Sequence, residues 1–142
     1  MKSTAPILLV EDDANDVFFL SRALAGVIEA PLEIVSDGQA AMNYLTITSK
    51  PEPCVALLDL NLPHKSGLEV LKWIRQESKR PTLIVIVLTS STSESDIDQA
   101  YRLGANSYVI KPTDATKLKE FVELLKRYWL GWNQSPPGCK KN

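Results

Sequence analysis

Short apolar runs alternate with longer amphipathic segments along this chain. Five runs are rich in strand-forming residues, and several of them lack any polar alternation; they cover residues 7–10, 32–35, 55–58, 83–88 and 107–110. Continuous apolar runs of this length are typical of strands that are covered on both faces. The pattern therefore predicts five short, buried strands.

Apolar residues recur at helical spacing after each predicted strand. These segments cover residues 17–27, 39–45, 68–74, 93–104 and 118–129. Ser93 with Asp96 resembles a capping box at the start of the fourth segment. Five strand–helix units in succession predict an α/β fold, a parallel sheet with helices on both faces. Ligands of such sheets bind beyond the carboxyl ends of the strands, so candidate chemistry is sought there.

Length and composition narrow the class of protein. A chain of 142 residues with 44% apolar and 23% charged residues is the size and balance of one globular domain. The formal net charge of −1 provides no basic field for nucleic acid or anionic lipid. The longest apolar run, 83–88, is too short to cross a bilayer, and residues 1–6 do not resemble a secretory signal. We expect a cytoplasmic protein with no nucleic-acid or membrane partner.

The sequence predicts one large domain and a short tail. We expect one domain over residues 1–130, followed by a tail, residues 131–142, with no output domain. Cys54 is expected to be a small core residue, and Cys139 lies in the polar tail. Two such cysteines predict neither a disulfide framework nor a cysteine metal site.

Charged and hydroxyl residues follow four of the predicted strands. They are Glu11, Asp12 and Asp13 after the first, Asp59 after the third, Thr89 and Ser90 at the end of the fourth, and Lys111 after the fifth. Carboxylates about 4 Å apart repel by roughly 4 kcal/mol at an effective dielectric of about 20, and a hard divalent cation such as Mg²⁺ relieves that repulsion. A carboxylate can attack phosphorus, while an ammonium and a metal stabilise the transferring group. The set predicts a magnesium-assisted phosphoryl site.

Five separated motifs carry a family resemblance. They are Val10-Glu11-Asp12-Asp13, Leu57-Leu58-Asp59-Leu60-Asn61-Leu62-Pro63, Ser66-Gly67, Leu88-Thr89-Ser90 and Lys111-Pro112. In this order they resemble the receiver domain of two-component response regulators, over about residues 5 to 130. Further cues, among them Asp37-Gly38, Ala105-Asn106-Ser107-Tyr108 and Tyr128-Trp129-Leu130, are similar to the single-domain regulators that serve bacterial phytochromes. The resemblance implies a flavodoxin-like sheet of strand order 2-1-3-4-5.

The resemblance also implies roles for individual residues. Asp59 is the phosphoacceptor, and Lys111 contacts the phosphoryl group. Asp12 binds Mg²⁺ directly, Glu11 acts largely through water, and Asn61 offers its backbone carbonyl. Thr89 is the hydroxyl of the switch, and Tyr108 is the aromatic side chain that turns inward when Thr89 moves. Lys111-Pro112 is expected to be a cis peptide, Asp13 a loop or cap residue, and Ser91 either a residue that steers water or a polar turn residue.

Partners follow from the same resemblance. A histidine kinase, of the phytochrome type, is expected to donate the phosphoryl group. Of the adjacent residues Phe18 and Phe19, we expect one to face the sheet and the other to lie at the rim, where it is a candidate kinase contact. The apolar stripe of the last helix is broader than one buried face needs, which favours a homodimer through the fourth helix, fifth strand and fifth helix. Alternatively, Trp132 and the tail fold back over the stripe.

Three other functions remain alternatives. A flavin or nucleotide enzyme needs a phosphate-cradling loop after the first strand, where this chain has acids. A phosphohydrolase of the haloacid-dehalogenase type carries a second acid two residues after its nucleophile, where this chain has Asn61. A phosphorylation-independent adaptor with a receiver fold is the remaining alternative, although degenerate receivers usually lose residues that this chain retains. We therefore expect a signalling switch and not an enzyme.

Overall fold

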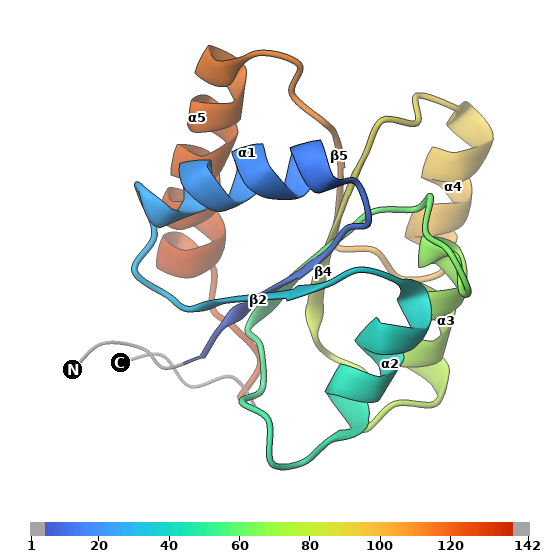
Figure 1. Cartoon of the computed structure of the whole chain (residues 1–142). Helices are drawn as coiled ribbons and strands as arrows, with labels where there is room; N and C mark the ends of the chain where they lie inside the picture. The colour runs from blue at the N-terminus through green and yellow to red at the C-terminus, as the bar shows by residue number, and fades with distance from the viewer. Residues whose placement is uncertain (1–4, 138–142) are drawn as a thin grey trace.

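The computed structural model describes residues 5–137 and contains one five-stranded sheet (Figure 1). The strands are β1 (Ile7–Val10), β2 (Leu32–Val35), β3 (Val55–Leu58), β4 (Ile84–Thr89) and β5 (Ser107–Ile110). Their order across the sheet is β2-β1-β3-β4-β5, and every neighbouring pair is parallel. The expected fold class and strand order are confirmed.

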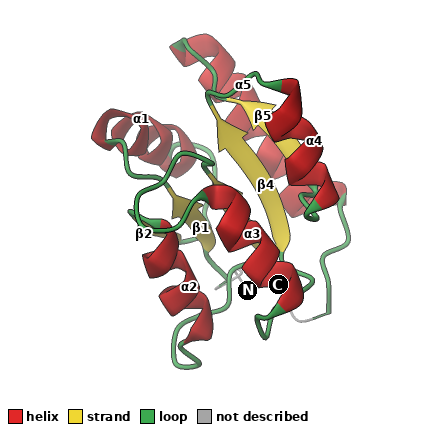
Figure 2. Cartoon of the chain, turned by 90° about the vertical axis from the view of Figure 1, so that its right-hand side faces the viewer, coloured by secondary structure: helices red, strands yellow, loops and turns green. Residues whose placement is uncertain are grey.

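Helices cover both faces of the sheet (Figures 1 and 2). They are α1 (Ala14–Ala25), α2 (Gly38–Thr46), α3 (Gly67–Gln76), α4 (Glu94–Arg102) and α5 (Ala115–Leu124). The first and last of these pack together on one face, while α2, α3 and α4 follow one another on the other face. Within residues 5–137, no helix has both the length and the hydrophobicity that crossing a bilayer requires.

Alternate residues of each strand face opposite layers, which divides the core in two. Leu8 and Val10 of β1 pack with α2, α3 and α4, whereas Ile7 and Leu9 pack with α1 and α5. The central strands are buried on both faces because each lies between two helical layers. This explains why their sequences read as unbroken apolar runs.

Each α-helix begins at a side-chain cap. The capping residues accept a hydrogen bond from the backbone N–H three positions later, and they are Asp13, Asp37, Ser66, Ser93 and Asp114. Such caps satisfy N–H groups that have no partner within the helix. Because three of these helices begin just after the carboxyl ends of β1, β4 and β5, the caps also fix where the loops at that edge turn.

The last helical segment differs from the prediction of one helix over 118–129. Regular α-helix ends at Leu124, and a π-helix, η1 (Leu125–Trp132), continues the chain. The wider turn still buries Leu125 and packs Trp129 and Leu130 against the core. A π-helix is rare, and hydrophobic spacing does not separate it from an α-helix over one or two turns.

Arg75, near the end of α3, ties together two loops at the amino end of the sheet, the one before β4 and the one before β5. Its guanidinium donates hydrogen bonds to the backbone carbonyls of Gly104, Pro81 and Leu83, and to Oδ1 of Asn106, all at 2.7–2.9 Å. Asn106 Oδ1 also accepts from the Val85 N–H at 2.8 Å. Burial lowers the pKa of Arg75. The hydrogen bonds of Arg75 therefore fix the segments that lead into β4 and β5.

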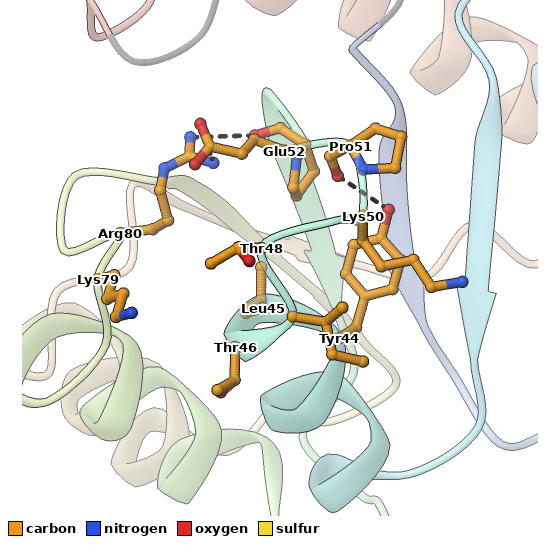
Figure 3. Close-up of a pocket in the computed structure, with 11 residues that line it drawn as sticks. Tyr44, Leu45, Thr46, Thr48, Lys50, Pro51, Glu52, Lys79 and Arg80 are labelled. Atoms are coloured by element: carbon orange, nitrogen blue, oxygen red, sulfur yellow. Dashed lines mark hydrogen bonds and ion pairs between the residues drawn. The ribbon is translucent and has the colours of Figure 1, made fainter.

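The segment that leads into β3 is held beside a small pocket, also at the amino end (Figure 3). The Tyr44 hydroxyl donates to the Pro51 carbonyl at 3.0 Å, and Arg80 pairs with Glu52 at 3.2 Å. Cys54, at the start of β3, is buried as expected, but it is disulfide-bonded, which corrects the expectation of no disulfide. Sequence spacing does not reveal such a pairing. The other cysteine, Cys139, and the last residues of the tail lie outside the described residues.

Candidate functional site

Two adjacent strands bring the acidic residues together. Val10 of β1 is in register with Leu58 of β3, and the Asp59 N–H donates to the Val10 carbonyl at 3.1 Å. The residues that follow these strands therefore leave the sheet side by side. Glu11, Asp12 and Asp59 each offer a carboxylate oxygen, and these oxygens all lie within 4.8 Å of one another. Glu11 and Asp59 are buried, whereas Asp12 is exposed.

Lys111 reaches this cluster from the end of β5. Its Nζ lies 2.5 Å from Glu11 Oε1, 3.0 Å from Asp59 Oδ2 and 2.7 Å from Asp16 Oδ2. Its backbone N–H donates to the Thr89 carbonyl at 2.8 Å, which anchors the residue to β4. Burial opposes the charged ammonium, but hydrogen bonds to the three carboxylates outweigh it and raise the pKa of Lys111 above its ordinary value.

The Glu11 carboxyl group lies in the buried part of the cluster. It is only 1% exposed, and this burial raises the pKa of Glu11 from 4.5 to about 7. The Lys111 ammonium and the backbone N–H of Asp13, which donates to Oε2 at 3.2 Å, oppose that rise. Near neutral pH, either protonation of Glu11 or binding of a cation beside it therefore stabilises this carboxyl group.

The donor set fits a hard divalent cation. All three side chains present carboxylate oxygens, which Mg²⁺ and Mn²⁺ prefer over nitrogen or sulfur. Asn61 lies beside them, because its backbone N–H donates to Asp59 Oδ1 at 3.3 Å. A single ammonium balances only part of the negative charge, so a divalent cation would lower the electrostatic energy of the cluster.

Thr89 and Tyr108 meet through the loop after β4. Thr89 is fully buried, and its Oγ1 accepts a long hydrogen bond from the Ser91 N–H at 3.5 Å. The Tyr108 hydroxyl donates to the Ser91 carbonyl at 2.9 Å. Ser91 Oγ in turn donates to Asp96 Oδ2 in the first turn of α4 at 2.5 Å. A continuous chain of contacts therefore runs from the acidic pocket to α4 and β5.

Gly67 lets α3 approach the pocket closely. A Cβ at this position would lie 2.2 Å from the Asp59 carbonyl oxygen and 2.6 Å from the Leu60 Cα. The Gly67 N–H also donates to the Leu60 carbonyl at 2.9 Å. Only glycine fits here, so this residue serves to position the Asp59 segment.

Comparison with known proteins bears on this arrangement. The family model of the response regulator receiver domain matches residues 7–123. The chain belongs to this family. The probable methanogenesis regulatory protein FilR2 of Methanothrix harundinacea is 42% identical over 134 residues, which are 92% of this chain and 86% of FilR2. Response regulator Rcp1 of Synechocystis is 38% identical over 129 residues, 87% of this chain and 88% of Rcp1.

Solved structures of receivers agree with these matches. The Mn²⁺-bound form of Rcp1 superposes with a TM-score of 0.84 at 36% identity, covering 93% of this chain and 99% of that one. The phosphorylated cyanobacterial phytochrome response regulator RcpA superposes with a TM-score of 0.87 at 34% identity, covering 94% and 99%. The receiver of this chain is thus similar to a phytochrome response regulator, and receivers of this family are signalling proteins.

Two details of the receiver differ from expectation. The Lys111–Pro112 peptide is trans, not cis; trans is the lower-energy form of X–Pro bonds, and three carboxylates already direct the ammonium. Phe18 and Phe19 are 53% and 57% exposed, so neither faces the sheet. Leu20 and Leu24 provide the buried face of α1 instead. Asp13 caps α1, as expected, and lies outside the cluster of acids.

Asp16, a residue of the receiver pocket, was not predicted from the sequence, and two roles were predicted for Ser91. Asp16 was not among the candidates, yet it is one of the three carboxylates on Lys111. Its signal was available: it lies in the first turn of the helix that begins at the acidic motif. The Ser91 hydroxyl donates a hydrogen bond to Asp96 and so stabilises the loop after β4. The Ser91 backbone is hydrogen-bonded to Thr89 and Tyr108 and links these two residues.

Proposed function

We propose that Asp59 accepts a phosphoryl group from a phosphohistidine of a histidine kinase and that the chain signals by switching conformation. The observation that carries this proposal is the convergence of Asp59 with two further acids and Lys111 in one pocket. A phosphoacceptor needs a carboxylate that is reachable, a cation next to it and an ammonium for the incoming charge. Oxygens of Glu11, Asp12 and Asp59 lie within 4.8 Å of one another, and the Lys111 ammonium lies 3.0 Å from Asp59 Oδ2.

In the proposed step a carboxylate oxygen of Asp59 attacks phosphorus. An O–P bond forms, the P–N bond to the kinase histidine breaks, and the leaving imidazole nitrogen takes up a proton. Lys111 moves from its carboxylates to the phosphoryl oxygens, and the Thr89 hydroxyl donates to another. Glu11, Asp12, Asp59 and the Asn61 carbonyl would hold Mg²⁺, which supplies positive charge to the transferring group.

The output passes through the contacts of Ser91. Phosphorylation adds negative charge at Asp59, which draws Thr89 toward it and pulls on the Ser91 backbone. Since Ser91 also binds Tyr108 and Asp96, that shift changes the surface of α4 and β5. A shift from 1% to 99% active needs about 5.5 kcal/mol of preference, which a few charge-assisted hydrogen bonds can supply. We propose no turnover of outside substrates.

The proposed kinase is of the phytochrome type, and the proposed location is the cytoplasm. The likeness to RcpA supports the choice of kinase. Phe18 and Phe19 form an exposed apolar pair on α1, and Phe19 lines a cavity together with Asp16 and Lys111, where a kinase helix would approach the site. This cavity, of about 450 Å³, is lined by Phe19, Leu20, Pro112 and Leu118. These apolar side chains line the same cavity as Lys111 and suit a docking helix.

We also propose a homodimer through α4, β5 and α5. Packing against the core leaves Leu124 and Tyr128 of the last helix half exposed, together with Ile110 of β5 and Tyr101 of α4. Trp132 is 83% exposed, so its side chain does not cover this surface. Light scattering at tens of micromolar, with and without phosphorylation, tests the dimer. A monomer under both conditions would reject it.

Phosphotransfer from purified, radiolabelled kinases tests the function. We expect label to move to this chain from an autophosphorylated phytochrome kinase faster than from an unrelated histidine kinase, and no label on Asp59→Asn. Equal transfer from both kinases would remove the phytochrome assignment alone. Binding to a kinase or target that is the same for the unmodified protein and Asp59→Asn, without any transfer, would favour the adaptor instead.

A further inference from the structure

The Lys111 ammonium has a carboxylate partner outside the acidic cluster. Asp16 Oδ2 lies 2.7 Å from Nζ, closer than Asp59 Oδ2 at 3.0 Å. Asp16 is not one of the acids whose oxygens converge on the candidate cation site. Its side chain is 38% exposed, whereas those of Glu11 and Asp59 are almost fully buried. Asp16 thus competes for the ammonium without sharing the task of metal ligation.

The position of Asp16 places its charge on the path to the phosphoacceptor. It lies in the first turn of α1 and lines the same cavity as Lys111 and Pro112. Because one ammonium joins the two carboxylates, the distance between Asp16 Oδ2 and Asp59 Oδ2 cannot exceed the sum of the two contacts to Nζ. A phosphoryl group on Asp59 would therefore meet the Asp16 charge at short range.

We infer that Asp16 is a positioning residue that sets the rate of phosphorylation. This inference rests on the proposed function of Asp59. In the unphosphorylated protein, Asp16 holds the ammonium toward α1, and Lys111 must release that contact to serve the phosphoryl oxygens. The Asp16 carboxylate also repels an anionic donor that approaches Asp59. Both effects slow the gain of phosphate, so this residue restrains phosphorylation by small donors.

Neutralising Asp16 should accelerate the reaction. Asp16→Asn keeps the shape of the side chain and removes its charge, and Asp16→Ser is a second variant, since Ser is tolerated in the first turn of a helix. With acetyl phosphate and saturating Mg²⁺, intact mass should show both variants gaining phosphate about 3- to 10-fold faster than the unmodified protein. Thermal melting of each variant checks that the fold is retained.

Asp13→Asn is the matched control. It removes the same charge from the same end of α1, and Asn caps helices as well as Asp does. The Asp13 carboxylate is exposed and accepts from the Asp16 N–H at 2.9 Å, and it has no contact with Lys111. We expect its rate to stay within about twofold of the unmodified protein, since an exposed charge without a partner in the pocket is screened by solvent.

The salt dependence of the phosphorylation rate separates a charge effect of Asp16 from a purely structural role, which salt would not alter. Screening shortens from about 10 Å at 0.1 M salt to about 3 Å at 1 M, so the advantage of Asp16→Asn should shrink as salt is added. Rates equal to or slower than that of the unmodified protein, or the same acceleration in Asp13→Asn, would overturn the inference while leaving the function of Asp59 intact. No phosphate on the unmodified protein would overturn both.

Discussion

Mg²⁺ affinity should depend on pH through Glu11. Burial raises the pKa of this carboxyl group from 4.5 to about 7 in the metal-free protein, and a metal ligand must be ionised. At pH 6 only about a tenth of Glu11 is ionised, and at pH 8 about nine tenths. Binding should therefore be about tenfold weaker at pH 6 than at pH 8, with close to one proton released per Mg²⁺ at pH 6.

The raised pKa of Glu11 also makes the stability of the fold depend on pH. Stability falls as pH rises, whereas Mg²⁺ affinity increases. The folded protein binds a proton at Glu11 that the unfolded chain does not between pH 4.5 and about 7. The contribution of this group to stability is therefore complete below pH 4.5 and is lost as pH rises to about 7. Mg²⁺ should restore stability most strongly above pH 7, where Glu11 is ionised.

Calorimetric titration with Mg²⁺ at pH 6, 7 and 8, repeated in buffers of different ionisation enthalpy, measures both the affinity and the released proton. Glu11→Gln is the control: it should bind more weakly at pH 8 because a ligand is lost, and its affinity should vary little with pH. Affinity of the unmodified protein that does not change between pH 6 and 8 would refute the reasoning, as would an unchanged pH dependence in Glu11→Gln.

Three substitutions test other parts of the account. Lys111→Met should bind Mg²⁺ about tenfold more tightly, because a competing cation is removed, yet gain phosphate about 10²–10³-fold more slowly; a fall in both would contradict the assigned role. Arg75→Ala should lower the free energy of unfolding in urea by about 2 kcal/mol, since partly buried carbonyls lose their donor, whereas Arg102→Ala, on an exposed helix face, should leave it unchanged. Phe19→Ser should slow phosphotransfer from a kinase but not from acetyl phosphate; equal slowing of both would reject the docking role.

The fold could be predicted because its local signals agree. The strands β1, β3 and β4 are buried on both faces, so their sequences are unbroken apolar runs with little ambiguity. The caps Ser66 and Ser93 mark where helices begin. The parallel arrangement followed from the alternation of strand and helix, since successive parallel strands require a crossover.

Features that depend on tertiary contacts could not be predicted in the same way. The change from α5 to η1 at Leu125 leaves the apolar spacing almost unaltered. Phe18 and Phe19 are large and apolar, which suggests burial, but Leu20 and Leu24 already fill the face of α1 that meets the sheet. The sequence shows which residues of a helix are apolar. Which of them are buried depends on the face of the helix that packs against the sheet.

For the site, residue types at strand ends indicated which side chains would meet. Glu11, Asp12, Asp59 and Lys111 do lie together, because parallel strands share one carboxyl edge. Asp16 was missed because the search was confined to strand ends, whereas Asp16 enters the pocket from the first turn of the helix that follows the acidic motif. The trans bond at Lys111–Pro112 was also missed, since the ion pairs that direct the ammonium are visible only in three dimensions.

The proposed function requires Asp59 to be the group that gains phosphate. Incubation of the full chain with acetyl phosphate and Mg²⁺, read by intact mass, measures this directly. We predict one added phosphate that appears only with a divalent cation, maps to Asp59 after hydride trapping and is lost in Asp59→Asn. An unchanged mass in every condition, or the same gain in Asp59→Asn, would contradict the account.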